Sequence, residues 1–382
     1  MTADRWRVPM VGRSPEEEGR TATTLELFFD LVFVVAIAFA AAAMHHDLVE
    51  GVVGQSILRY SQVFFAIWWA WMNFTWFASA YDTDDIPYRL SIFVGITGAL
   101  LLAAGVPEAF ENGEFTVVTM GYVVMRMVLV SLWLRAGGDD PERSLTAHRF
   151  AVGITLAQLG WVLLLLASEA IVPAGFVILV IVELAVPIWA ESASPTSWHR
   201  EHIVERYGLF TIIVLGESIL ASSIAIQSVM SEVTDSVDLI LIIVGGLLTV
   251  FSMWWLYFER PSHDLLTTLR RAFVWGYGHY FVWGSAAAVG AGLAVAIDHA
   301  TGQGHIGPFG AGAAVAVPAA TYLVALWVLH YVPRAWGLVA NLKAPTAAVL
   351  VLLTPLTGQA VPLTGLILAT LLTSKLVGST RG

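Results

Sequence analysis

Long apolar stretches separated by short polar breaks run through almost the entire chain. A helix needs about 20 apolar residues to cross a hydrocarbon core, and the breaks leave about twelve stretches of that kind. The expected helices lie roughly at 24–44, 56–80, 88–108, 115–135, 147–167, 172–191, 203–227, 237–258, 272–297, 309–331, 343–357 and 361–377. The last two are short and interrupted by Pro355, Gly358 and Pro362, so 343–377 forms either two spans, a tilted hairpin or a re-entrant pair. The pattern predicts an all-α, polytopic membrane protein.

The basic residues predict how these helices are oriented. If the N-terminus is cytoplasmic, all but two of the 19 Lys and Arg residues fall in segments on the inner side. The exceptions are Arg59, at the outer end of the second helix, and Arg126, within the fourth. Outer segments such as EAFENGEF and QSVMSEVTDS contain no basic residue. This distribution predicts about twelve spans with both termini in the cytoplasm.

The composition excludes several classes of protein. The chain is 57% hydrophobic and 13% charged, whereas soluble domains carry about 25% charged residues. It contains no cysteine, which excludes disulfides, thiolate metal sites and cysteine nucleophiles. Residues 1–20 have no apolar core, so no signal peptide is expected there. The net charge of −10 comes without a basic patch, so no nucleic-acid partner is expected.

No segment supplies the groups of an enzyme or a cofactor site. A phosphate-binding loop, a dinucleotide fingerprint, HExxH and GxSxG are all missing from a usable context. The polar loops are too short for a catalytic domain, and no nucleophile–base pair is evident. The histidines and aspartates within 45–47 and 298–305 match no recognised metal spacing. We therefore expect no enzymatic activity, no cofactor and no metal site.

A weak internal repeat relates the two halves of the chain. Laying 28–38 over 215–225 places Asp30 on Glu217, and the Trp-Trp pairs of the following helices then align as well. An even number of helices separates the copies, so both run the same way through the membrane, as in a parallel repeat. The expected parts are a cytoplasmic tail at 1–20, two repeats of about six helices at 21–193 and 203–378, and a cytoplasmic linker at 194–202.

Four ionisable residues lie deep in the expected helices, namely Asp30, Arg126, Glu183 and Glu217. Such charges persist in a bilayer only when they are paired or hydrated. We favour a structural ion pair between Arg126 and Glu183, which leaves Asp30 and Glu217 for a central pathway between the halves. Three acids against one base favour a cation or proton over an anion. Two alternatives stay open. Asp30 lies close enough to the cytoplasmic face to be hydrated by bulk water, or Arg126 itself lines the pathway.

Further candidates surround this set. Glu26 shares a helix face with Asp30 and is assigned to the same pathway. His279 is either a hydrogen-bonded core histidine or a proton relay near an acid. Together with Glu26 and Asp30, the residues Glu205 and Arg206 are expected to cluster toward the cytoplasmic mouth.

Two segments resemble a known family. TTLELFFDLVFVVAIAFA at 23–40 and ERYGLFTIIVLGESILA at 205–221 are similar to the two hallmark segments of the bacterial low-temperature-requirement A (LtrA) family. The resemblance implies a multi-pass protein of the bacterial cytoplasmic (inner) membrane with a role in growth in the cold. The family residues that it carries over are Glu26, Phe29, Asp30, Glu205, Arg206, Gly208, Gly216, Glu217 and Ser218. A weaker similarity to two-repeat potassium channels, whose Phe-Ser-Asp motif lacks its serine here, favours only the general class of an ion pathway between halves.

Two functions from different classes follow. The first is a transporter or channel for a small cation, proton or solute through a central acidic site. The alternative is a non-transporting scaffold or lipid-related protein that supports growth at low temperature. The expected partners are the lipid bilayer and a small ion or solute; a homo-oligomer is one alternative for the assembly. The substrate and its direction of travel stay open.

Overall fold

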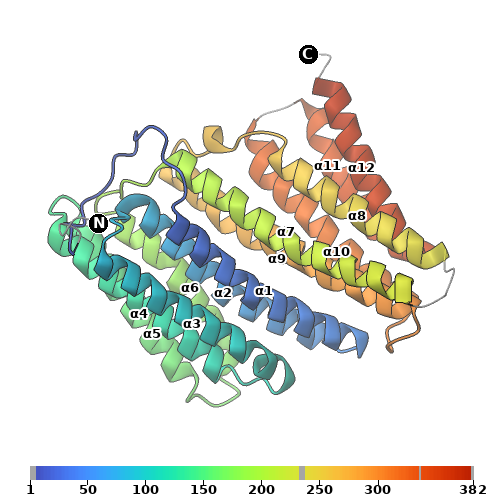
Figure 1. The fold of residues 1–382 in the computed structure, drawn as a ribbon, viewed down its shortest axis with the longest axis horizontal. Coiled ribbons are helices and arrows are strands. Elements are labelled where there is room, and N and C mark those ends of the chain that lie inside the picture. The colour runs from blue at the N-terminus through green and yellow to red at the C-terminus, as the bar shows by residue number, and fades with distance from the viewer. Residues whose placement is uncertain (1–5, 232–236, 335–336, 380–382) are drawn as a thin grey trace. The chain divides into compact units, whose positions relative to one another are not determined.

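The computed structural model describes residues 6–231, 237–334 and 337–379, and all regular structure within them is helical. The twelve α-helices follow one another along the chain (Figure 1). Their bounds are α1 Thr24–Val49, α2 Val53–Tyr81, α3 Ile86–Glu111, α4 Thr116–Asp139, α5 Ser144–Leu164, α6 Val172–Glu191, α7 Arg200–Ser231, α8 Val237–Phe258, α9 Leu269–Ala300, α10 Pro308–Leu326, α11 Leu338–Leu353 and α12 Ala360–Ser379. The all-α class expected from the sequence is confirmed.

Within the described residues, nine helices are long and apolar enough to cross a membrane. They are α1, α3, α4, α5, α6, α8, α9, α12 and the segment Pro308–Arg334, which contains α10. The helices α2, α7 and α11 fall outside this set; α11 has only 16 residues. The chain is therefore a membrane-type protein with several apolar helices, while the count of about twelve spans and the internal repeat stay predictions.

The chain divides into two compact units. The first comprises Met1–Ala36 and Ala66–Arg206, and the second comprises Ile37–Phe65 and Tyr207–Gly382. The division passes through α1, α2 and α7, so each of these helices contributes to both units. The first unit contains α3 to α6, which pack in sequence on one another. In the second unit α9 packs on α10, and α8 packs on α12.

Small residues let the neighbouring helices approach closely. A Cβ atom on Gly121 of α4 would lie 2.3 Å from the Leu102 nitrogen of α3. In the second unit, a Cβ atom on Gly292 of α9 would lie 2.1 Å from the Ala314 oxygen of α10. Close backbone contact through glycine is the ordinary packing mode of membrane helices, where side-chain burial from water does not drive association.

The segment 6–23 crosses the helix ends of the first unit. The Arg13 amide donates to the Ala80 carbonyl at 2.8 Å, and the Met10 amide donates to the Asp139 carboxylate at 3.0 Å. The Val8 amide donates to Asp85 at 2.8 Å. Asp85 also caps α3 by accepting from the Tyr88 amide, and it pairs with Arg135. These contacts hold the start of the chain beside the entry to α1, where the first group of buried charges lies.

Candidate functional site

Arg206 of α7 lies between the two acids of α1. Its guanidinium donates from Nε to Asp30 Oδ2 at 3.1 Å and from Nη2 to Asp30 Oδ1 at 2.5 Å. The remaining nitrogen, Nη1, lies 2.7 Å from Glu26 Oε1. Glu26 and Asp30 are four residues apart, so they project from one face of α1 and share one guanidinium. We call these three residues the Arg206 centre; all three are buried.

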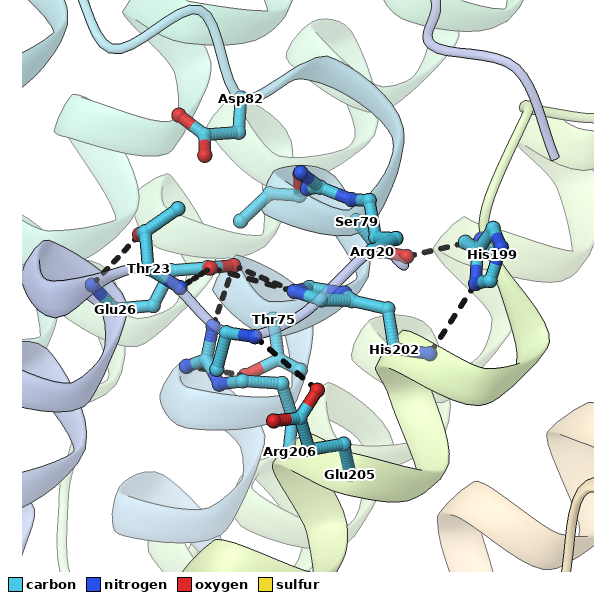
Figure 2. Close-up of polar contacts among 12 residues, drawn as sticks. Arg20, Thr23, Glu26, Thr75, Ser79, Asp82, His199, His202, Glu205 and Arg206 are labelled. Carbon is cyan, nitrogen blue, oxygen red and sulfur yellow. Dashed lines mark hydrogen bonds and ion pairs between the residues drawn. The ribbon is translucent and has the colours of Figure 1, made fainter. Parts of the chain in front are cut away.

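Further donors complete the Arg206 centre. The Trp71 indole donates to Asp30 Oδ1 at 2.7 Å, and the Thr23 amide donates to Glu26 Oε2 at 2.8 Å. His202, one turn before Arg206, places Nε2 3.2 Å from Glu26 Oε1. Figure 2 shows His202 and Arg206 of α7 directed toward Glu26. Every member belongs to the first unit, so the centre fixes the start of α1 against α2 and the start of α7.

Further charged residues lie where the end of the segment 6–23 meets this centre. Arg20 donates from Nη2 to the Ala78 carbonyl at 3.0 Å, and the Ala22 amide donates to the Glu205 carboxylate at 3.1 Å (Figure 2). Asp82, in the connection between α2 and α3, is also buried. Burial and the nearby Glu26 carboxylate raise the pKa of Asp82 to about 6, against the opposing effect of Arg20. This carboxyl group therefore keeps its proton to a higher pH than an exposed aspartate does.

Glu183 of α6 is the focus of a second buried group, which we call the Glu183 centre. Arg126 donates to its Oε2 atom at 2.8 Å, and this is the ion pair favoured from the sequence. Four neutral donors also contact the Glu183 carboxylate, at 2.8 to 3.2 Å. They are Trp69, Tyr122, Gln158 and Trp161. With five donors and 0% exposure, this carboxylate has no free face.

Arg126 uses only part of its guanidinium in that pair. Its Nε and Nη1 atoms have no hydrogen-bond partner among the described residues. Arg126 also lines a cavity of about 20 Å³ with apolar neighbours such as Phe29 and Phe74. This volume is sufficient for about one water molecule. Such a water would hydrate the guanidinium without opening the Glu183 centre.

Glu217 of α7 has different surroundings in the second unit. It lines a cavity of about 180 Å³ that we call the Glu217 cavity. The cavity is bounded by Ala41, Ala42, His45, Leu220, Gly290, Ala291, Ala294, Ile297 and Asp298. His45 Nε2 lies 2.7 Å from Asp298 Oδ2, whereas Glu217 has no hydrogen bond or ion pair within the described part of the chain. The alanines of α1 and α9 and Gly290 of α9 are too small to fill this space, so the carboxylate stays half-buried.

Similarity to known proteins identifies the family of this chain. The family described as bacterial low temperature requirement A protein matches residues 21–378, nearly the whole chain. The chain belongs to the LtrA family. It is also 30% identical over 257 residues to an uncharacterised protein of Rhizobium meliloti (strain 1021). That similarity covers 65% of this chain and 60% of the relative.

The two segments that carry the LtrA resemblance meet at the Arg206 centre. The first provides Glu26 and Asp30, the second provides Arg206, and 176 residues separate Asp30 from its partner. Glu205 lies beside them, where it accepts from the Ala22 amide. The second segment also carries Glu217, which belongs to the other unit. The expected juxtaposition of Asp30 and Glu217 between the halves stays a prediction.

His279 lies in the second unit, within a group of aromatic rings. Its Nε2 atom is 3.0 Å from the Tyr257 hydroxyl, and its Nδ1 atom is 2.7 Å from the Trp275 carbonyl. The rings of Tyr207 and Trp283 lie 4.8 and 5.0 Å from the imidazole, centre to centre. Both ring nitrogens thus have hydrogen-bond partners, the arrangement of a core histidine.

Several residues of these centres give little signal in the sequence. Tryptophans in an apolar helix look like ordinary packing residues. Trp69, Trp71 and Trp161 nevertheless donate their indole N–H groups to the buried carboxylates. Gln158 is the exception, because an amide in the middle of an apolar helix is itself a sign of a polar partner. Among the described residues, no group of three or more His, Asp or Glu is placed to hold a metal ion.

Proposed function

We propose that this LtrA-family protein transports or conducts a small cation or proton, and that Glu217 lines the pathway. The single observation that carries the proposal is the Glu217 cavity, in which a half-buried carboxylate faces open space. Intramembrane acids that neither pair nor pack are rare, because the charge is costly there, and they mark ion and proton pathways.

The charge of the Glu217 cavity favours a cation. Its ionisable side chains are Glu217, Asp298 and His45. Even with His45 protonated, two carboxylates against one imidazolium leave one negative charge. A proton or a small cation neutralises that charge, whereas an anion would add to it.

The other predicted site residues have more specific supporting roles in this proposal. Glu26, Asp30 and Arg206, with Glu205 beside them, hold the inner ends of α1 and α7 and form the cytoplasmic mouth. Arg126 and Glu183 fix α4 against α6 as a structural pair. We assign His279 a packing role, because both of its ring nitrogens have hydrogen-bond partners.

The proposal includes a topology and a location. We place the chain in the bacterial inner membrane, with about twelve spans and both termini in the cytoplasm, on the distribution of Lys and Arg. The two repeats, related by an axis along the membrane normal, would place the first helices of each half at their interface. The substrate passes between those halves.

A scaffold without transport is the second candidate function. The Arg206 and Glu183 centres favour it, because Asp30 and Glu183 each accept from several buried donors. A protein that only orders helices or lipids in the cold would need such centres. It would have no use for the unpaired Glu217.

Flux through proteoliposomes tests the proposal. The purified chain would be reconstituted and tested with K⁺, Na⁺ and H⁺ gradients, beside empty vesicles and vesicles containing Glu217→Gln. The matched control is Glu114→Gln, which removes an exposed acid from the α3–α4 connection. We expect flux of one of these ions in wild type and in the control, and its loss in Glu217→Gln. If wild-type and empty vesicles behave alike for all three ions, the scaffold becomes the better account.

A further inference from the structure

A groove at the beginning of α9 has two arginines at its rim and an apolar wall. Its volume is about 420 Å³, and it lies wholly within the second unit. The lining residues are Leu265, Thr268, Arg270, Arg271, Val274, Trp275, Val328, Leu329 and Pro333. We propose that this groove binds the phosphate group of an anionic phospholipid, with an acyl chain along its apolar wall.

The charge at the rim is unbalanced. Arg270 and Arg271 are exposed, and within the described ranges neither pairs with a carboxylate. The Arg271 guanidinium donates to the Thr267 hydroxyl at 2.9 Å, and the Arg271 amide donates to the Thr268 hydroxyl at 3.3 Å. Among the described residues that line the groove, none is acidic. Two guanidinium groups with free donors match a phosphate, which accepts paired hydrogen bonds from arginine.

The backbone adds to the attraction for an anion. Thr268 caps α9, and both arginines lie in the first turn of this 32-residue helix. The first turn of a helix carries a partial positive charge and backbone amides without helical acceptors. A phosphate at the rim is therefore attracted by side chains and by the helix end together.

The wall of the groove identifies the ligand as a lipid. Val274 of α9 is 58% exposed, and Val328 opposite it is 45% exposed. Leu265, Leu329 and Pro333 continue this apolar surface. Trp275 also lines the groove, and its indole N–H has no acceptor among the described residues. A free phosphate ion would use the rim alone and would gain nothing from the apolar wall.

The position along the chain agrees with a lipid headgroup. The apolar span of α9 begins at Leu269, so the arginines lie where the helix enters the hydrocarbon region. The wall opposite α9 comes from the π-helical turn Trp327–Tyr331 and from Pro333. Basic pockets between helix ends on the cytoplasmic side are typical sites for anionic headgroups.

Native mass spectrometry of the full chain in a non-ionic detergent tests the proposal. The protein would be titrated with dioleoylphosphatidylglycerol, dioleoylphosphatidylcholine and inorganic phosphate in separate arms. The test variant is Arg270→Gln with Arg271→Gln. The matched control is Arg89→Gln with Arg200→Gln, because these exposed arginines also lie in the first turns of helices, α3 and α7.

We expect wild type and the control to retain phosphatidylglycerol in preference to phosphatidylcholine. The test variant should bind phosphatidylglycerol about thirtyfold more weakly, at about fivefold for each arginine. If the double variant does not fold, the single variants carry the test with the fivefold effect. Equal binding of both lipids, or unchanged binding in the variants, would overturn the proposal. Competition by inorganic phosphate at the concentration of the lipid would overturn it in favour of a free-anion site.

Discussion

Glu183 and Glu217 are the same residue type in apolar helices, but their surroundings differ in kind. Glu183 accepts from five donors and is fully buried. Glu217 is half-buried, lines a cavity and has no partner among the described residues. The side chains of the neighbouring helices therefore decide the role of an acid in a membrane helix. Hydrogen-bond donors make it a structural residue, whereas small residues leave it accessible to a ligand.

The neighbouring helices explain the difference. Around Glu183, α2, α4 and α5 present large side chains that carry N–H or O–H groups, such as Trp69 and Tyr122. Around Glu217, α1 and α9 present mainly alanine and glycine. Large donors fill space and stabilise the ionised carboxylate by hydrogen bonds, whereas small residues leave the space open and the carboxylate without donors.

Removal of the charge at Glu183 should change the free energy of unfolding more than any other substitution considered below. Glu183→Gln leaves Arg126 buried without a carboxylate among the described residues, and it should lower the free energy of unfolding by about 3–5 kcal/mol. Thermal and denaturant unfolding in mixed micelles would measure this. The control is Glu169→Gln, an exposed acid in the α5–α6 connection. A change below about 1 kcal/mol would show that Glu183 is not a structural acid.

Asp82 is a third buried acid, in the connection between α2 and α3, and the nearby arginines only partly offset the cost of burying its charge. Its pKa is about 6 in the folded protein and 3.8 in the reference state, so the folded state binds protons more tightly. Ionisation opposes folding: stability should fall as pH rises from about 4 to 6, by up to about 3 kcal/mol, and stay level above. Asp82→Asn should remove this dependence and stabilise the protein at pH 8. An unchanged pH profile in the variant would contradict the assignment.

The effect of removing Asp30 should lie between those of removing Glu183 and Glu217, because Arg206, its partner, also pairs with Glu26. In Asp30→Asn, Arg206 keeps its ion pair with Glu26 at 2.7 Å, so no buried charge is stranded. We expect a loss of about 1.5–3 kcal/mol, the range for hydrogen bonds to a charged group. Unfolding of the variant beside Glu183→Gln in the same micelles measures the difference. If Asp30→Asn is the more damaging of the two, the sharing of Arg206 by two acids is wrong.

Glu217 should show the smallest effect on stability. Since it forms no hydrogen bond or ion pair within the described residues, Glu217→Gln should change the free energy of unfolding by about 0.5 kcal/mol or less. The same unfolding series measures it, with Glu114→Gln as the control. A loss as large as that of Glu183→Gln would mean that Glu217 has a structural partner, and the contrast between the two acids would fail.

The sequence predicts the helical class and the partner of Arg126 because both depend on local signals. Apolar runs define helices, and one base in the fourth expected helix requires an acid at similar depth. The sequence also groups Glu26 and Asp30 with Arg206 toward the cytoplasmic mouth, but it does not predict the direct ion pair between Asp30 and Arg206, because Asp30 is assigned to the pathway. That pairing joins helices 176 residues apart, and nothing local specifies which turn of α7 faces α1. The Glu217 cavity could not be predicted either, because it depends on which alanines and glycines of α1 and α9 meet.

Carbodiimide labelling of reconstituted protein reports the accessibility of Glu217 and its contribution to ion flux in the same vesicles. An apolar carbodiimide reacts with carboxyl groups that it can reach inside the membrane, and peptide mapping by mass spectrometry identifies the modified residue. We expect modification at Glu217 but not at Glu183, with loss of ion flux in proportion to the Glu217 label. Modification of Glu183 in preference to Glu217, or full flux through vesicles whose Glu217 is labelled, would contradict this expectation.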